Sequence, residues 1–356
     1  MRNVLDFAYD AQPMRVVFRP GAALTATPAE AERLGLRRVL VLSGARGADT
    51  ARAVADALGE ACAGVHAEAR MHVPVDVADR AVERARTLGA DGCVAVGGGS
   101  AVGLGKAIAL RTGLPLIAVP STYAGSEMTP VWGLTENGVK RTGRDPAVLP
   151  RSVVYDPELT LELPVPLTVT SGINAIAHSV EALYAPDTSP LIALMAEEGV
   201  RAMAGALPRL AVEPASSEAR SRALYGAWLS GSCLGGTTMG LHHKLCHVLG
   251  GTFGLPHAET HTVVLPYALA YNAPAAPDAA AAVARALDAG DAPRALWDLG
   301  RRLDAPRSLA ELGLKEGDLA TAATQAVSQE YANPRPVTEE GALALLRAAY
   351  EGTPPA

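Results

Sequence analysis

The chain has 356 residues, which is more than one compact hydrophobic core usually holds and predicts two domains. Hydrophobic residues make up 49% of it and charged residues 19%, a balance that excludes a disordered protein. A net charge of -6 and the lack of any Lys- or Arg-rich block argue against a nucleic-acid partner and favour a small-molecule one.

Cysteine usage and hydropathy indicate the cellular compartment in which the protein is expected. The four cysteines show no CxxC spacing, and a chain with this many apolar residues does not need disulfides to fold. The N-terminus "MRNVLDFAYD" lacks an apolar signal core, and no uninterrupted apolar stretch reaches about 18 residues. We therefore expect a cytoplasmic protein with no membrane contact.

The first 160 residues alternate short apolar runs with helical segments. The runs "MRVVF", "RVLVLSG", "DGCVAVGGGS" and "PLIAVPS" are typical of buried strands, and "AEAERLG", "TARAVADALG" and "AVGLGKAIALRTG" are typical of helices. Strands separated by helices of this length predict βαβ units and a parallel sheet with helices on both faces. The prediction for residues 1–160 is a Rossmann-like α/β domain that binds a dinucleotide.

The second part, residues 161–356, has almost no strand signal and is predicted to be an all-helical substrate and catalytic domain. The 3.6-residue periodicity predicts helices over 171–184, 190–206, 216–233, 237–249, 259–271, 276–288, 292–303, 316–329 and 337–350. We expect the active site in the cleft between the two domains.

The segment "CVAVGGGSAVGLGK" is an apolar strand that ends in a glycine turn and continues as a helix. Glycines there let the backbone approach a pyrophosphate, and the helix N-terminus favours its negative charge, although an ordinary tight turn would have the same composition. A second strand end, "AVPSTYAGS", follows one crossover later and should lie at the same edge of the sheet. The expected cofactor contacts are Gly97, Gly98, Gly99, Ser100, Ser121 and Thr122.

The usual GxGxxG fingerprint is absent, and so is an acidic residue at the end of "RVLVLSG". Ser43 stands where that acidic residue would hold a ribose 2'-hydroxyl, and we expect Ser43 to contact the cofactor instead. Without the carboxylate nothing repels a 2'-phosphate, so both NADH and NADPH are expected as cofactors.

Five of the eight histidines fall within "LHHKLCHVLGGTFGLPHAETH", residues 241–261. Residues four apart share a helix face, which pairs Asn174 with His178, His243 with His247, and His257 with His261. Three histidines and a carboxylate would suit Fe(II) or Zn(II), but no carboxylate has the matching position. Taken singly, each of these histidines is more often a core or surface residue.

The motifs "GGGS", "PSTYAGSEMTP", "VVYDPEL", "NAIAHSVEALY" and "HHKLCHVLGGTFGLPH", in this order, resemble the iron-containing alcohol dehydrogenase superfamily over nearly the whole chain. The resemblance implies that an Asp and three His bind the metal in that superfamily. The corresponding positions here are Asn174, His178, His243 and His257, and His247 matches a histidine beside the reacting carbon. A neutral amide at Asn174 removes the anionic ligand.

A second departure is Gly103, where the superfamily pattern GGGSxxDxxK has Asp. Both departures, with "TYAGSEMTP", "TGRDP" and "LHHKLCH", resemble one branch of the superfamily, the maleylacetate reductases, which are regarded as working without metal. The resemblance implies reduction of the C=C bond of maleylacetate, a dicarboxylate, to 3-oxoadipate in aromatic-compound degradation. It also implies a homodimer and no metal; Asn174, His178, His243 and His257 would be vestigial metal positions.

The resulting role assignments are hypotheses. His243 and His247 would supply a hydrogen-bond donor and a proton to an enolate, His178 and His257 would shape the same pocket, and Lys244 is a further catalytic candidate. Lys140 matches a superfamily lysine near the cofactor ribose. The expected substrate contacts are His242, Asn174, Arg144 and Tyr123.

Three other functions remain open from the sequence. The nearest is a metal-dependent alcohol or polyol dehydrogenase of the same superfamily, in which Asn174 ligates Fe(II) or Zn(II) through its amide oxygen. A lyase similar to dehydroquinate synthase would need more Lys and Arg for a phosphorylated substrate. A non-catalytic ligand carrier would explain the histidines and leave the glycine turn unexplained.

Overall fold

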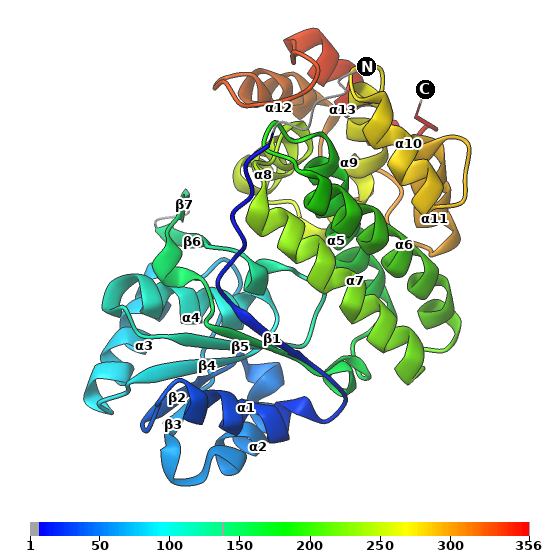
Figure 1. Ribbon diagram of the computed structural model, residues 1–356. Coiled ribbons are helices and arrows are strands. Elements are labelled where there is room, and N and C mark those ends of the chain that lie inside the picture. The colour runs from blue at the N-terminus through cyan, green and yellow to red at the C-terminus, as the bar shows by residue number, and fades with distance from the viewer. Residues whose placement is uncertain (1–6, 137–138, 356) are drawn as a thin grey trace. The chain divides into compact units, whose positions relative to one another are not determined.

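The structure is a computed structural model that describes residues 7–136 and 139–355 (Figure 1). The chain divides into two compact units. One unit is Gln12–Leu163, and the other is Pro164–Ala356 together with residues 7–11. The change of unit coincides with the proline-punctuated segment "ELPVPL", where Pro164 immediately precedes the first long helix.

The first unit contains a six-stranded sheet, and every pairing within it is parallel. Its order is β1-β8-β5-β4-β2-β3. The strands are β1 (Arg15–Phe18), β2 (Val39–Leu42), β3 (Cys62–His66), β4 (Gly92–Gly97), β5 (Leu116–Pro120) and β8 (Ser152–Tyr155). The helices between them are α1 (Ala22–Arg33), α2 (Ala48–Leu58), α3 (Val75–Thr87) and α4 (Gly99–Thr112).

The sheet lies between two layers of helices (Figure 1), and alternating side chains of its strands pack against one layer or the other. In β2, Val39 and Val41 pack with α1 and α2, whereas Leu40 and Leu42 pack with α3 and α4. All four side chains are fully buried, which explains why this strand is a continuous apolar run without polar alternation. The predicted Rossmann-like parallel sheet is confirmed.

Five elements of this unit are not expected from the sequence. The strand β3, "CAGVH", has few β-branched residues, and the strand β8 overlaps the motif "VVYDPEL", which contributes only to the family resemblance. The amphipathic helix α3 is the third. The other two, β6 (Val131–Glu136) and β7 (Val139–Arg144), form an antiparallel hairpin that lies outside the main sheet.

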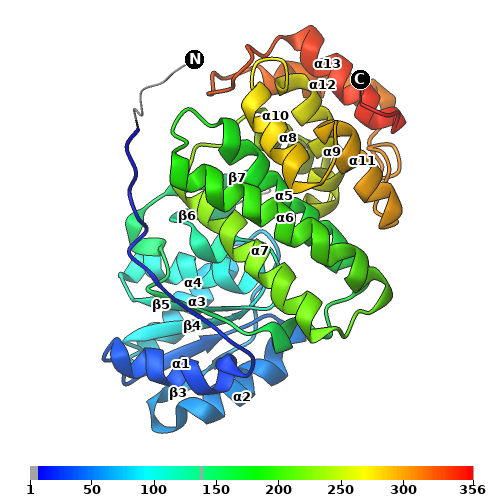
Figure 2. The same cartoon turned by 45° about the vertical axis from the view of Figure 1, so that its right-hand side comes forward.

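The second unit is helical throughout its described part, as predicted. Figure 2 shows α5, α6 and α7 running alongside one another. The helices are α5 (Val165–Tyr184), α6 (Pro190–Val212), α7 (Ser217–Gly236), α8 (Leu241–Phe253), α9 (His257–Asn272), α10 (Pro277–Ala286), α11 (Ala292–Arg302), α12 (Leu319–Ala326) and α13 (Glu339–Glu351). Among the helices described, none combines the length and apolar character needed to cross a membrane.

Among the helix starts of this unit, that of α5 differs most from its prediction. The helix begins at Val165, six residues before the expected residue 171, and Pro166 lies in its first turn. Proline is tolerated there because the first amides of a helix have no intrahelical partner. The earlier start does not change which face of α5 carries Asn174 and His178.

Candidate active site

Three helices of the second unit bring the histidines together. From α5 come Asn174, His178 and Glu181, which lie on one face because they are four and three residues apart. Helix α8 carries His242, His243 and His247, and α9 begins at His257 and carries His261 one turn later. The predicted helical pairing of His257 with His261 is therefore confirmed.

The rings form one contiguous cluster. His243 stacks on His178 with their ring centroids 5.2 Å apart, and it meets His261 edge-on at 4.9 Å. Nε2 of His242 lies 2.9 Å from Nδ1 of His261, and the ring of His257 lies 4.3 Å from that of His261. His247 lies at the edge of the cluster, 6.2 Å from His243.

Burial separates these histidines into two groups. His178, His242, His243 and His261 are buried, whereas His247 and His257 are exposed. Burial lowers the pKa of His178, His242 and His261 well below the usual value for histidine, so that these three rings are neutral at neutral pH.

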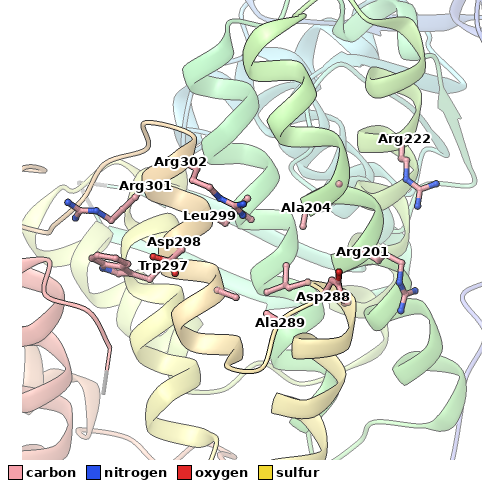
Figure 3. A pocket seen from close by; sticks show the side chains of 14 residues that line it. Arg201, Ala204, Arg222, Asp288, Ala289, Trp297, Asp298, Leu299, Arg301 and Arg302 are labelled. Atoms are coloured by element: carbon pink, nitrogen blue, oxygen red, sulfur yellow. The ribbon is translucent and has the colours of Figure 1, made fainter.

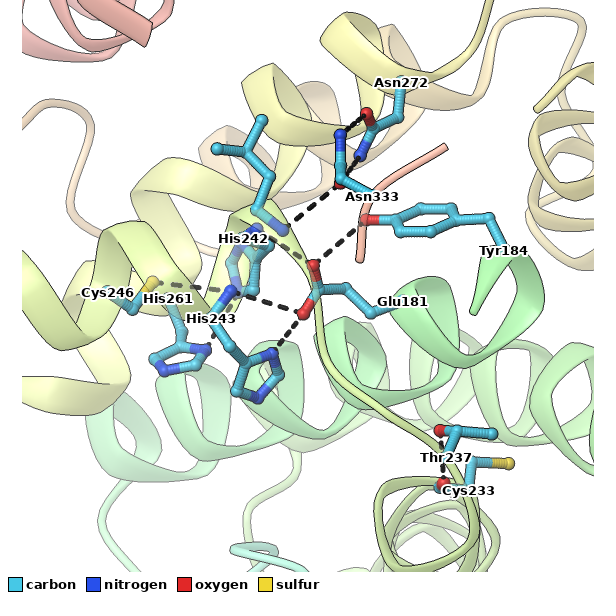
Figure 4. A network of polar contacts seen from close by, with 11 residues as sticks. Glu181, Tyr184, Cys233, Thr237, His242, His243, Cys246, His261, Asn272 and Asn333 are labelled. Atoms are coloured by element: carbon cyan, nitrogen blue, oxygen red, sulfur yellow. Dashed lines mark hydrogen bonds and ion pairs between the residues drawn. The ribbon is translucent and has the colours of Figure 1, made fainter. Parts of the chain in front are cut away.

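A buried carboxylate in this cluster was missed by the sequence reasoning. Glu181, with no exposed surface, lies beside His243, and Nδ1 of His243 donates to its Oε2 at 2.5 Å (Figure 4). The backbone N–H of His242 donates to Oε1 at 2.9 Å, and that of His243 to Oε2 at 3.3 Å. The signal was available: a Glu three residues after His178 lies on the same helix face.

Glu181 also caps the N-terminus of α8 by accepting hydrogen bonds from its backbone amides. The N-cap residue Gly240 has no side chain with which to cap the helix, so oxygens from elsewhere accept its first amides. Asn333 accepts from Leu241 N through Oδ1, and Glu181 accepts from the next two. A β carbon at Gly240 would lie 3.0 Å from that Asn333 oxygen and 3.3 Å from Glu181 Oε1, which accounts for glycine at this position.

The donor set at the superfamily's metal positions contains no anionic ligand. Asn174 and the three histidines are all neutral ligands, and Oδ1 of Asn174 and Nδ1 of His178 are buried with no hydrogen-bond partner among the described residues. The carboxylate beside them, Glu181, already accepts three hydrogen bonds from His242 and His243. A tighter group of ring nitrogens, from His242, His243 and His261, likewise contains no anionic ligand.

The glycine turn lies at the carboxyl end of β4 in the first unit. Ser121 N donates to Gly97 O at 3.2 Å, which joins the turn to the end of β5 as expected. A β carbon at Gly98 would lie 2.9 Å from Thr122 Cγ2, so only glycine permits this approach. Gly98 caps α4 without a side chain and leaves the first amides of that helix available to a phosphate.

The second departure from the superfamily pattern has a steric cause. A β carbon at Gly103, in α4, would lie 2.7 Å from Cγ2 of Val73. Val73 fills the space that a side chain at position 103 would need, and this side chain is itself buried. An Asp at this position would therefore require Val73 to move.

Lys106, one turn further along α4, is hydrogen bonded to backbone carbonyl groups of the loop that follows β5. Its buried Nζ donates to the carbonyl oxygens of Ser126, Thr129 and Val131 at 2.6, 2.8 and 2.7 Å. Burial lowers the pKa of Lys106 to about 7. The lysine thus fixes the loop that follows β5 to the helix that follows the glycine turn.

Three of the predicted contact residues are fully buried, and their roles stay predictions. These residues are Ser43, Tyr123 and His242. Burial lowers the pKa of His242 well below the usual value for histidine, so this ring is neutral at neutral pH. The hydroxyl of Ser43 has no hydrogen-bond partner among the described residues.

The other predicted residues have accessible or partly accessible side chains. Ser100, Ser121 and Thr122 are half-buried, and Arg144 is exposed at the end of β7. Lys244 is half-buried, with Nζ 6.0 Å from the ring centroid of Tyr331. The side chain of Lys140 lies outside the described part of the chain.

A pocket of about 890 Å³ opens elsewhere in the helical unit (Figure 3). It is lined by residues of α6, α7, α10 and α11, among them Arg201, Arg222, Asp288, Trp297 and Arg302. None of the predicted site residues lines it. We place the candidate site at the histidine cluster because the reactive groups are there.

The comparisons with known proteins agree with the fold. The family model "Iron-containing alcohol dehydrogenase" matches residues 13–157, and the model of the C-terminal part of the Fe-containing alcohol dehydrogenase family matches residues 168–350. The chain belongs to the iron-containing alcohol dehydrogenase family. The family prediction is thus confirmed.

Within this family the chain is similar to maleylacetate reductases. The maleylacetate reductase of Burkholderia cepacia is 54% identical over 98% of this chain and 99% of its own length. The crystal structure of maleylacetate reductase from Agrobacterium tumefaciens has a TM-score of 0.96 at 51% identity and covers 99% of this chain and 100% of its own. The crystal structure of maleylacetate reductase from Rhizobium sp. strain MTP-10005 has a TM-score of 0.95 at 52% identity and covers 98% of this chain and 99% of its own.

Proposed function

We propose that this chain is an oxidoreductase that reduces the C=C bond of maleylacetate to give 3-oxoadipate, with a nicotinamide cofactor and without a metal ion. The observation that carries the proposal is the identity of 54% to a maleylacetate reductase over nearly the full length of both chains. The neutral donor set at the former metal positions supports the metal-independent form.

The reaction follows from the substrate's own chemistry. Its C=C bond is conjugated to a ketone, so hydride adds to the carbon β to the ketone and leaves an enolate. A nicotinamide cofactor supplies that hydride when bound. The enolate then takes a proton at the other carbon of the former double bond, the one bonded to the ketone, which completes the reduction.

The residues of the α/β unit would hold the cofactor. The uncapped amides at the start of α4 suit the pyrophosphate, and the half-buried hydroxyls of Ser121 and Thr122 lie at the adjoining strand end. No carboxylate follows β2 to repel a 2'-phosphate, because Ser43 is the first residue after that strand. Acceptance of both NADH and NADPH is part of the proposal.

The residues of the helical unit would stabilise the enolate and supply its proton. His243 has its Nδ1 engaged by Glu181, so Nε2 is the ring atom that can exchange a proton with the substrate. The exposed His247 lies beside it and can donate a hydrogen bond to the enolate oxygen, while His178 holds the ring of His243 from its other face. Lys244 is the nearest cation in sequence for a substrate carboxylate.

The test is oxidation of NADH by the EDTA-treated protein with freshly generated maleylacetate, with metal analysis of the same sample. We expect turnover to survive the chelator in protein that contains no stoichiometric iron or zinc. Activity that is lost with EDTA and restored by Fe(II) or Zn(II) would instead establish a metal-dependent dehydrogenase.

A pair of variants localises the reaction. His243→Asn should lower kcat by about 100-fold or more, because it removes the proton-exchanging atom. His72→Asn, an exposed histidine of the other unit, is the matched control and should retain normal turnover. Normal turnover by both His243→Asn and His247→Asn would contradict the assignment.

A homodimer and a cytoplasmic location stay predictions of the sequence.

A further inference from the structure

Among the described residues, His243 is the only one of the four buried histidines of the cluster whose ring is hydrogen bonded to a carboxylate. The rings of His242 and His261 bond to each other, and His178 only stacks on its neighbours. The partner of His243, Glu181, lies on α5 rather than on the helix of His243 itself. The hydrogen bond to Glu181 therefore fixes the ring of His243, and the other three buried rings of the cluster have no such bond to a carboxylate among the described residues.

Three contacts fix that geometry. The same oxygen, Oε2 of Glu181, accepts from both the ring Nδ1 and the backbone N–H of His243, at 2.5 and 3.3 Å. Two donors from one residue to one oxygen restrict rotation of the ring about its side-chain bonds. The stacked ring of His178, 5.2 Å away and on the same helix as Glu181, limits tilting. Nδ1 must carry the proton, because a carboxylate oxygen only accepts.

We propose that Glu181 is a positioning residue for the reduction proposed above: it keeps the proton on Nδ1 of His243 and fixes the ring, so that Nε2 faces the reacting carbon. This inference rests on the proposed function. During turnover the bare Nε2 takes a proton from solvent and then gives it to the enolate carbon, which returns the ring to its starting state. The Nδ1 proton stays between His243 and Glu181 throughout, as the corresponding proton does in other carboxylate–histidine pairs.

A purely structural role for Glu181 is the alternative, because its oxygens also accept the second and third amides of α8. The variant Glu181→Gln separates the two roles. With its amide oxygen on the N–H of His242, its NH₂ group faces Nδ1 of His243 and needs an unprotonated nitrogen there, and the 3.3 Å bond from the backbone N–H of His243 is lost. The proton of the ring should then move to Nε2.

The experiment combines kinetics with ¹⁵N NMR of histidine-labelled protein, the His243 signals being assigned by comparison with His243→Asn. In the wild type we expect the proton on Nδ1 and a bare Nε2, and in Glu181→Gln the reverse. We expect kcat of Glu181→Gln to fall by about 100-fold with little change in KM for maleylacetate. Tyr184→Phe is the matched control, because Tyr184 donates to Glu181 Oε1 at 3.4 Å and makes no such bond to His243.

Two results would overturn the inference. One is a wild-type ring that carries its proton on Nε2, a measurement that needs no variant to fold. The other is a Glu181→Gln protein with the reversed tautomer and undiminished kcat, which would leave Glu181 as a helix cap alone. Failure of the wild type to reduce maleylacetate would count against the proposed function, and the tautomer would still report on Glu181.

Discussion

Asn174 and Glu181 show how single residues set the chemistry of this site. An amide stands at position 174, where the family resemblance expects a metal-binding carboxylate, and its oxygen is left without a hydrogen-bond partner among the described residues. The carboxylate of this region is at position 181, where it accepts from Nδ1 of His243. The carboxylate of this region is therefore hydrogen bonded to the ring of His243, and position 174 carries a neutral amide.

Loss of Lys106 should destabilise the α/β unit, because this buried side chain holds three backbone carbonyl groups. In Lys106→Met the carbonyl oxygens of Ser126, Thr129 and Val131 lose their common donor inside the protein. We expect the free energy of unfolding in urea to fall by about 3 kcal/mol, because buried acceptors left unpaired are costly. Lys315→Met, at an exposed lysine, is the control and should change it by less than about 0.5 kcal/mol. Equal stability of the two variants would show that the loop does not depend on Lys106.

At the level of elements, the contact between the glycine turn and the end of β5 is set by one missing β carbon. Gly98→Ala should destabilise the protein by about 1–3 kcal/mol, since its β carbon would lie 2.9 Å from Thr122 Cγ2 and 3.0 Å from Thr122 Oγ1. Urea unfolding without cofactor measures this directly.

The neighbouring glycine supplies the control for that measurement. At Gly99 a β carbon would meet Ala124 Cβ at an ordinary 3.8 Å, so Gly99→Ala should be nearly neutral. Thr122→Ala removes both crowding atoms and should restore much of the stability that Gly98→Ala loses. A destabilisation that persists in the double variant would point to the backbone of the turn and not to the Thr122 contact.

The elements also show what local pattern can and cannot reveal. Helices α6 and α11 begin where predicted, at residues 190 and 292, because a side-chain cap and a proline in the first turn mark each start. The edge strand β3 was missed because "CAGVH" carries neither alternation nor a β-branched run. Its strand conformation depends on pairing with β2, which is a contact between distant residues.

At the scale of the whole molecule, the buried neutral histidines predict loss of stability in mild acid. The unfolded chain binds protons at His178, His242 and His261 as the pH falls through about 6.5, whereas the folded chain does so only at much lower pH. Their contribution is therefore fully present above about pH 6.5 and is lost below it, by up to roughly 1.4 kcal/mol per pH unit for each histidine.

Urea unfolding at about pH 7.5, 6.5 and 5.5 measures that loss. The midpoint should change little between the first two values and fall clearly at the third. His261→Gln should make the fall shallower, whereas His247→Gln, at an exposed histidine, should leave it as in the wild type. A midpoint that is constant down to about pH 5.5 would contradict neutral burial of these rings.

The sequence by itself determined the class of fold, the helical second half, the family and the helix faces that carry the histidines. These features depend on residues close together in the chain, through hydrophobic periodicity, glycine and proline signals and spacing along a helix. Only the tertiary structure decided which histidines are buried, and therefore neutral, and that Glu181 is bonded to His243. Burial and hydrogen bonding between helices depend on how distant segments pack, which no local pattern records.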